Sequence, residues 1–516
     1  MKRKMIACLA VILLLCVTLV PFAVSAVAEH KAVCENCGLL GDHDGNGVVD
    51  LDDAIYLLYH VNFPASYPLA GTEAEKPHEP TPLYAGFAER DFTPTEMGGN
   101  MPGASYPVIA KKVEMPLFAN AAAFESDSSP LIIVSVDMLR LGDADCAEMK
   151  KRIEKETSVP TDCIMIVATH THSGVGLNYQ HNQNPPNVEG YNHMMDMAVE
   201  AAVEAWNTRE RAKMGFGKTE LPGYSFCREA FLTNGDVKTW PTTASKIDRL
   251  ISEPDQSVNV IRVDGADDKI KCFVINYANH PDTSSKSGYN PDYPGYLRKK
   301  LKETYGEDTV VVYLNGAEGD VNNYDYLNST KVGNNSVIGY ALADAVIALN
   351  PSITATEEYP EIRVNFQKHA MVQEKPTAEQ IEWAKKTMAK IEAGESVANL
   401  DKKYAMEYTG MDYSALPELH DVEIQTVVLG DFAMVALPFE AYSELGWRIR
   451  EQSPYENTFV VVQANASYGY IGPGFIYGTS SYGARYSYYT ARFSRGGGDL
   501  LVKYSVEMLK EIKEAK

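Results

Sequence analysis

Residues 162–174 read DCIMIVATHTHSG, an apolar run that ends in two histidines, His170 and His172. A short apolar run of this kind is typical of a buried strand, and functional loops follow the strand ends in α/β folds. We therefore expect both imidazoles in a loop at the end of a strand. Taken alone, the pair fits either a metal site or a hydrogen-bonded loop.

Other apolar runs further along the chain also lead into polar side chains. "FVINYANHP" carries His280, and "VVVYLNGAEGDVNN" leads into an acidic turn that contains Glu318 and Asp320. "FAMVALPFEAY" carries Glu440. Two imidazoles and one carboxylate are a usual ligand set of a catalytic zinc ion. The runs that carry His170, His280 and Glu440 therefore predict a zinc site where their ends meet.

The region from residue 84 onward alternates strand-like and helix-like segments, which predicts an α/β fold with mixed sheets flanked by helices. The strands are expected in "LIIVSVDML", "DCIMIVATH", "KCFVINYANH", "DTVVVYLNG", "IQTVVLG" and "FAMVALP". Helices are expected at about 143–156, 190–207, 294–305, 333–349, 376–393, 440–452 and 497–514. We treat residues 84–516 as one large catalytic domain.

The first 28 residues are typical of an export signal. Lys2, Arg3 and Lys4 precede a long apolar run, and the small residues Ala26 and Ala28 suit a cleavage site. A retained membrane anchor is the alternative, because the run approaches the length that spans a bilayer. The predicted localisation is secreted or at the cell surface.

Residues 29–63 contain a predicted calcium loop that runs into a helix, and a Pro-rich linker at 64–83 follows. The loop has EF-hand spacing, in which alternate residues direct oxygen atoms toward one hard cation. The predicted calcium ligands are Asp42, Asp44, Asn46, the carbonyl of Val48, Asp50 and Asp53. The segment resembles one half of a type I dockerin. A single repeat is compatible with a cohesin-type partner or with a calcium-stabilised spacer.

Composition limits the classes of partner. The 47 Lys and Arg against 69 Asp and Glu give a net charge of -22, which opposes a general grip on nucleic acid phosphates. The 31 tyrosines suggest an aromatic-rich surface or cleft. Six of the eight cysteines follow the signal, and their pairing is open.

Seven motifs occur in the order and approximate spacing of the catalytic domain of neutral ceramidases, and residues 84–516 resemble that family. The motifs are "YAGFAERDFTP", "SVDMLRLG", "ATHTHSG", "NYANHP", "NGAEGDVNN", "LPFEAY" and "NASYGYIGP". The resemblance implies one zinc ion bound by His170, His280, Glu440 and Tyr470. Tyr468 is two residues from Tyr470 and is the alternative tyrosine.

The resemblance also implies polar groups around the reacting carbonyl. His172 matches a proton shuttle, and Arg228 matches a group that holds a carboxylate or a developing oxyanion. An ordinary ion pair is the alternative for Arg228. Tyr482 and Tyr486 are the nearest matches to the active-site tyrosines of the family.

One residue departs from the family pattern. Ceramidases that cleave sphingolipid amides carry a serine after "GDV", and this chain has Asn322 there. A carboxamide is no nucleophile, so we expect zinc-activated water to attack, with Asn322 orienting the substrate.

Two functions of different class follow. The first is a zinc-dependent hydrolase of an amide or ester bond in a small-molecule, lipid or glycolipid-like substrate. The second is a catalytically inactive binding protein with the same fold, attached to a cell-surface or extracellular complex.

Overall fold

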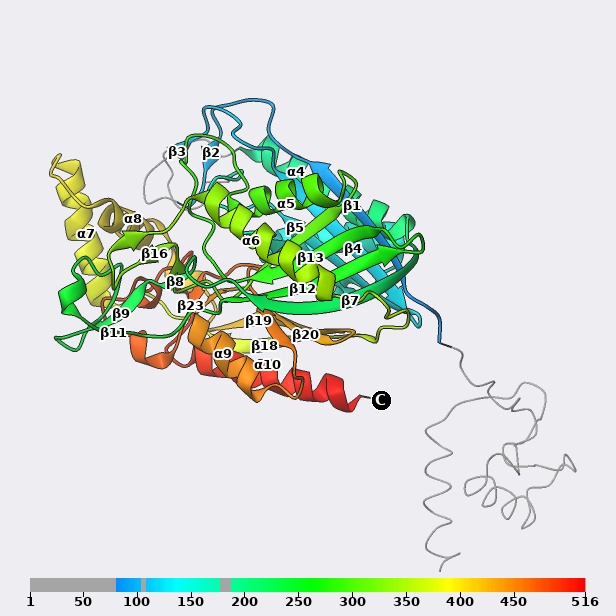
Figure 1. Ribbon diagram of the computed structural model, residues 1–516. Coiled ribbons are helices and arrows are strands. Elements are labelled where there is room, and N and C mark those ends of the chain that lie inside the picture. Colours follow the sequence, from blue (N-terminus) through cyan, green and yellow to red (C-terminus); the bar gives the residue numbers. More distant parts are fainter. Residues whose placement is uncertain (1–79, 104–107, 177–186, 516) are drawn as a thin grey trace, which may run out of the picture. The chain divides into compact units, whose positions relative to one another are not determined.

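The computed structural model describes residues 80–103, 108–176 and 187–515 (Figure 1). The predicted signal peptide and the whole calcium loop lie outside these residues, as does the predicted linker up to residue 79. Among the helices that are described, none combines the length and the apolar character needed to cross a membrane.

The larger of two main sheets has eight strands in the order β14-β13-β12-β7-β1-β4-β5-β6. Only the pairs at its two edges, β13 with β14 and β5 with β6, are parallel, so the sheet is mixed, as predicted. The strands are β1 Tyr84–Asp91, β4 Phe118–Ser126, β5 Ser129–Val136, β6 Ile164–Ala168, β7 Glu210–Glu220, β12 Ser257–Gly265, β13 Ile270–Tyr277 and β14 Val310–Asn315.

The smaller sheet has the order β18-β19-β20-β22 and packs face to face against the larger one. Its strands are β18 Ile362–Val372, β19 Leu419–Leu429, β20 Phe432–Ala436 and β22 Thr458–Val461. Side chains alternate between the faces of a strand. On β5, Ile133 therefore joins the core between the sheets, whereas Ile132 and Val134 join the core beneath the helices.

Helices cover both outer faces and complete a four-layer arrangement (Figure 1). The large sheet is covered by α3 Asp143–Thr157, α4 Val188–Asn207, α5 Tyr293–Tyr305 and α6 Asn335–Leu349, and the small sheet by α9 Ser443–Gln452 and α10 Gly497–Glu514. Two further helices, α7 Ala378–Glu392 and α8 Asn399–Gly410, pack against each other at one end of the molecule.

Each of the seven predicted helices is present, with its ends within three residues of the expected bounds. The helix expected from residue 440 begins later, because Glu440 and Ala441 form the short strand β21. Helix α8 was not predicted. Its buried face includes Lys403 and Glu407 beside Tyr404 and Tyr408, so it lacks an apolar stripe.

The large sheet curves until its two edges meet, and this brings the site together. Ser135 on β5 donates a buried hydrogen bond of 2.6 Å to the carbonyl of Tyr313 on β14, at the opposite edge. The chain beyond β22 then runs beside β6, where the amide of Ala168 donates to the carbonyl of Gln463 at 3.1 Å. The carboxyl ends of β6, β13 and β14 therefore lie close together.

Short strands and loops surround this end of the sheets. They include β2 Asn100–Met101, β3 Val108–Ile109, β8 Phe226–Cys227, β9 Glu229–Leu232, β10 Val237–Thr239, β11 Ile247–Leu250, β15 Val321–Asn322, β16 Tyr324–Asp325, β17 Thr330–Lys331, β21 Glu440–Ala441 and β23 Tyr470–Ile471.

The four cysteines within the described residues, Cys146, Cys163, Cys227 and Cys272, are free thiols. Cys272 is buried, whereas Cys163 is only partly buried because it ends a short turn before β6.

Candidate functional site

The predicted ligands follow strands at the meeting point of the sheet edges. His170 lies two residues beyond β6, His280 lies three residues beyond β13, and Glu440 begins β21. All three are buried. His170 has a φ of +72°, a left-handed conformation that is uncommon for a residue other than glycine. Such strain is concentrated at functional sites.

The two ligand histidines face each other through Nε2 atoms that are 3.2 Å apart. The Nδ1 atom of His170 lies 2.7 Å from the carbonyl of Leu139, and Nδ1 of His280 lies 3.4 Å from the carbonyl of Glu318. Because a carbonyl only accepts, these contacts place the ring protons on Nδ1. Burial lowers the pKa of His170, but the charges of Glu440 and Glu318 raise it overall, so without a metal a second proton on this ring can lie between the two Nε2 atoms. A metal ion between them would replace that proton.

Two carboxylates complete the cluster. Oε2 of Glu440 is 3.4 Å from Nε2 of His170 and has no hydrogen-bond partner. Oε1 of Glu318 is 3.9 Å from the same nitrogen, and Oε2 of Glu318 is also without a partner. One ligand atom from each of His170, His280, Glu318 and Glu440 lies within 4.8 Å of the others, so this buried group could hold a metal ion.

The electrostatics of the cluster support the same conclusion. Burial opposes ionisation of Glu440, but His170, Tyr470 and Arg228 together lower its pKa to about 2. Burial and the charge of Glu440 together raise the pKa of Glu318 to about 8. Two buried carboxylates at this distance resist being anions together unless a cation compensates them. A divalent metal would supply that charge, so the residues fit the predicted ion.

Tyr470 and Arg228 border the cluster. The parallel pairing of β21 with β23 sets Glu440 opposite Tyr470. The Tyr470 hydroxyl accepts a 3.0 Å hydrogen bond from Nη2 of Arg228, which also donates to the carbonyl of Gly319 at 2.8 Å. Tyr468, the alternative tyrosine, instead belongs to an apolar core with Phe439.

Arg228 lacks the ion pair that was its alternative explanation. It is 5% exposed, and no carboxylate among the described residues lies within ion-pair distance of its guanidinium. Its Nε atom is buried and without a hydrogen-bond partner. A buried donor of this kind is available to a substrate oxygen.

His172 lies beside the two ligand histidines, with ring centroids 5.2 Å from His170 and 5.0 Å from His280. Its Nδ1 is 3.1 Å from the carbonyl of Gly103 and 3.8 Å from Oδ1 of Asp282. Its Nε2 is buried and unpartnered. Burial lowers the pKa of His172 to about 3, so the imidazole is neutral and offers a lone pair at Nε2.

The other predicted site residues lie at different depths. The Tyr482 ring packs 5.4 Å from the ring of Tyr470, whereas Tyr486 packs against Tyr408 in a separate aromatic cluster that includes α8. Asn322 donates from Nδ2 to the hydroxyl of Tyr326 at 3.0 Å. Tyr482 therefore lies against Tyr470, which borders the candidate metal site, whereas Tyr486 lies against Tyr408 of α8.

Sequence reasoning noted Glu318 but assigned it no role. It shares an acidic turn with Asp320, and nothing in the sequence distinguishes the two. In the structure Asp320 accepts hydrogen bonds from Ser252 and from Ser443, each at 2.7 Å, so it fastens loops together. Glu318 instead faces the histidines.

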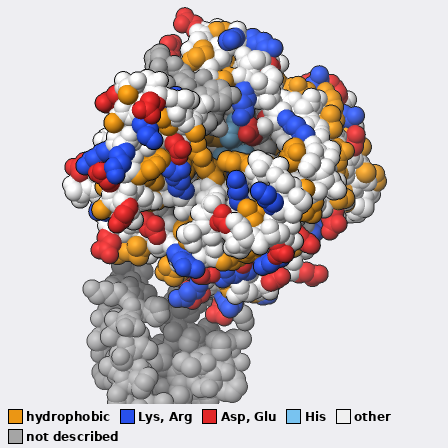
Figure 2. Space-filling view, turned by 90° about the vertical axis from the view of Figure 1, so that its left-hand side faces the viewer, with side chains coloured by type: hydrophobic (Ala, Val, Ile, Leu, Met, Phe, Trp, Pro, Cys, Tyr) orange, Lys and Arg blue, Asp and Glu red, His pale blue; other side chains and the backbone are white. Residues whose placement is uncertain are grey.

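Figure 2 shows a hollow in one face of the molecule with histidine at its base and acidic and basic side chains around it. The rings of Tyr470, Tyr482 and Trp240 form an aromatic wall, in which the centroid of Trp240 is 5.2 Å from that of Tyr482. Trp240 is 40% exposed and lies at the outer side of this wall.

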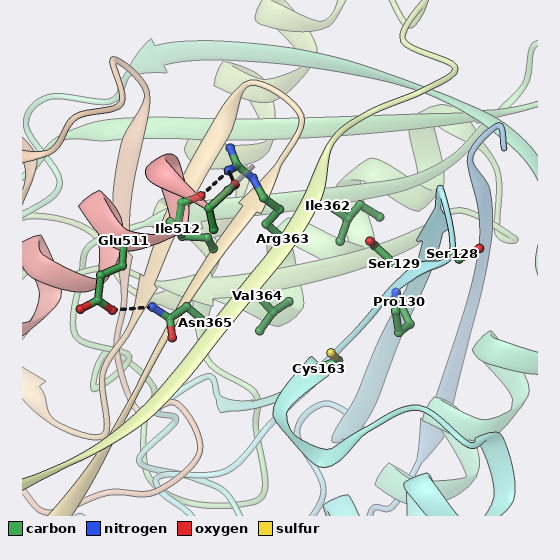
Figure 3. Close-up of a pocket in the computed structure, with 11 residues that line it drawn as sticks. Ser128, Ser129, Pro130, Cys163, Ile362, Arg363, Val364, Asn365, Glu511 and Ile512 are labelled. Carbon is green, nitrogen blue, oxygen red and sulfur yellow. Dashed lines mark hydrogen bonds between the residues drawn. The ribbon is translucent and has the colours of Figure 1, made fainter. Parts of the chain in front are cut away.

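A second pocket, of about 570 Å³, lies between the turn before β5, strand β18 and the end of α10 (Figure 3). Its two charged side chains make hydrogen bonds within the protein, although Nε of Arg363 has no partner. Arg363 donates to the carbonyls of Ile512 and Ala515, and Glu511 accepts from Asn365 at 3.2 Å. The pocket carries none of the candidate chemistry.

No family model and no curated protein matches the sequence. Among solved structures, the chain is similar to the neutral ceramidase from Pseudomonas aeruginosa, with a TM-score of 0.64, 17% identity, and coverage of 84% of this chain and 75% of that one. It is also similar to a ceramidase complexed with C2, with a TM-score of 0.63, 16% identity, and coverage of 84% and 76%. The described domain has the neutral ceramidase fold.

Proposed function

We propose that this chain, which has the neutral ceramidase fold, is a secreted zinc-dependent hydrolase of an N-acyl amide or ester bond. The substrate is a small molecule or a lipid-like or glycolipid-like compound. One observation carries the proposal: four buried donor atoms of His170, His280, Glu318 and Glu440 converge at the strand ends.

The metal ligands in this proposal are His170, His280, Glu440 and Tyr470. When bound, a zinc ion supplies Lewis acidity, which polarises a carbonyl and activates water at neutral pH. The protein fixes both imidazoles through their Nδ1 contacts, so that each Nε2 is free for the ion.

Two further groups act on the substrate. His172 accepts or returns a proton at Nε2, because its Nδ1 is held by Gly103 and its Nε2 is free. Arg228 donates from Nε to the carbonyl oxygen as negative charge develops there. Tyr482 packs beside Tyr470 and forms part of the wall that contacts the substrate.

In the proposed mechanism activated water attacks the substrate, so no serine is needed at position 322. We expect Asn322→Ser to change the hydrolysis rate by less than about thirtyfold, because the substitution removes at most two hydrogen bonds of about 1 kcal/mol each. Asn322 is hydrogen-bonded to Tyr326 and to the amide of Tyr324. Steady-state kinetics of the variant checks this. A rate increase of several hundredfold would show that the missing nucleophile limits the enzyme.

The test of the proposed function is the metal content of the mature protein after exhaustive dialysis. We expect about one zinc ion per chain, measured by elemental analysis, because the converging ligands form one site. Zinc-loaded protein is then screened against N-acyl amides and against carboxylic, carbohydrate and phospholipid esters. Zinc-free protein that nevertheless binds a lipid or glycan would favour the inactive binding protein instead.

The same elemental analysis reports on the N-terminal region. We propose one calcium ion bound by the loop of residues 42–53, on the basis of its EF-hand spacing. Export by the signal at residues 1–28 is part of the proposal. A cohesin-type partner rests on the single dockerin-like repeat.

A further inference from the structure

Glu318 is a buried carboxylate whose charge has no adequate partner in the protein. The residue is 0% exposed. Oε1 receives only a long hydrogen bond of 3.5 Å from Nε2 of Gln463, and Oε2 receives none. Among the described residues, no lysine or arginine nitrogen lies within 4.0 Å of it, and its one ion-pair contact is His170. Removing an uncompensated carboxylate from water costs several kcal/mol.

Three hydrogen bonds made by the backbone of Glu318 and Gly319 fix the position of Glu318. Its own carbonyl is the partner of His280 Nδ1 at 3.4 Å. The next residue, Gly319, donates its amide to the carbonyl of Ala441 at 2.9 Å and accepts from Arg228 at 2.8 Å. A Cβ at Gly319 would lie 2.3 Å from the carbonyl oxygen of Glu440. Only glycine allows this approach, which sets the Glu318 and Glu440 segments side by side.

The distances suit a ligand of the same ion. Atoms bound at 2.0–2.2 Å to one zinc ion lie within about 4.4 Å of one another. The Nε2 atom of His170 is 3.2 Å from that of His280, 3.4 Å from Glu440 and 3.9 Å from Glu318. One cation would therefore satisfy Oε2 of Glu440, Oε1 of Glu318 and both imidazoles.

We infer that Glu318 is a further direct ligand of the metal, so that a second carboxylate joins the proposed ligands His170, His280, Glu440 and Tyr470. This inference rests on the proposed metal centre and extends its chemistry. A second carboxylate neutralises the charge of a divalent ion and adds a hard oxygen donor, which widens the set of metals that the site accepts toward manganese and iron.

Glu318→Gln tests the inference, because the amide keeps the shape of the side chain and removes its charge. The zinc affinity of the full chain is measured by competition with a chromophoric chelator, and cobalt-loaded protein gives an absorption spectrum that reports its ligands. We expect zinc affinity to fall about 100-fold or more, since even partners of ligands contribute 10–100-fold. The cobalt spectrum of the variant is expected to differ from that of the wild type.

Glu229→Gln is the matched control. Glu229 is equally buried and also has an unpartnered Oε2, but its Oε1 accepts hydrogen bonds from Thr239, Tyr442 and Ser481, and it lies outside the ligand cluster. We expect its zinc affinity to stay within a few-fold of wild type. Metal-free Glu318→Gln protein is expected to melt close to metal-free wild type, because the amide keeps the shape of the side chain and the only hydrogen bond at stake is the long one from Gln463.

The outcomes separate this inference from the proposed function. Wild-type zinc affinity and an unchanged cobalt spectrum in Glu318→Gln would overturn the ligand role and leave the hydrolase proposal intact. A lower melting temperature of the metal-free variant would also overturn it, because Glu318 would then stabilise the fold. Wild-type protein that binds neither zinc nor cobalt would refute the metal centre as a whole.

Discussion

Replacing His170 and His280 together by alanine is expected to abolish zinc binding and to slow hydrolysis by at least about 10⁴-fold. The two imidazoles face each other at 3.2 Å and supply half of the converging donor atoms. A metal ion contributes several kcal/mol to such a reaction, and each 1.36 kcal/mol corresponds to a tenfold change in rate. Elemental analysis and steady-state kinetics of the double variant measure both effects.

Two controls separate loss of the ligands from damage to the fold. His369→Ala with His420→Ala removes two histidines outside the cluster and should leave the zinc content unchanged. Because His170 has a positive φ, alanine there keeps the backbone strain of about 1 kcal/mol that histidine also carries, whereas glycine relieves it. A His170→Gly, His280→Ala protein that keeps one zinc ion per chain would refute the ligand assignment.

The fold was largely predictable because its strands are buried on both faces. Strands such as "CIMIVA" and "VVVYLN" pack between a helix layer and a second sheet, so they appear in the sequence as continuous apolar runs. Helix α8 escaped prediction because its buried face carries Lys403 and Glu407 beside Tyr404 and Tyr408. Its hydrophobic pattern is therefore weak.

The site was only partly predictable, for a geometric reason. His170 and His280 follow strands at opposite ends of the sheet order, and only the curvature of the sheet brings them together. Sequence motifs identified both residues through a resemblance. They could not distinguish Glu318 from Asp320, because the direction of each side chain depends on partners from distant loops, such as Ser443.

His172 is expected to contribute most after the metal ligands. Replacing it by alanine should lower kcat about 10²–10⁴-fold while the protein keeps its zinc, because a positioned acid or base contributes that much. His172 is near the ligands, but its Nδ1 is directed at Gly103 and its Nε2 is free. Kinetics on the zinc-loaded variant, with zinc content measured on the same sample, checks this.

His172→Asn distinguishes proton transfer from support of the nearby loop. The Asn amide can still donate a hydrogen bond to the carbonyl of Gly103, the contact that His172 makes through Nδ1 at 3.1 Å. It has no equivalent of Nε2, so it cannot carry a proton at that position. If His172 transfers a proton, the asparagine and alanine variants lose similar amounts of kcat with little change in KM. If asparagine restores the rate to within a few-fold of wild type, the histidine instead holds the Gly103 segment in place, and the proton must leave by another route.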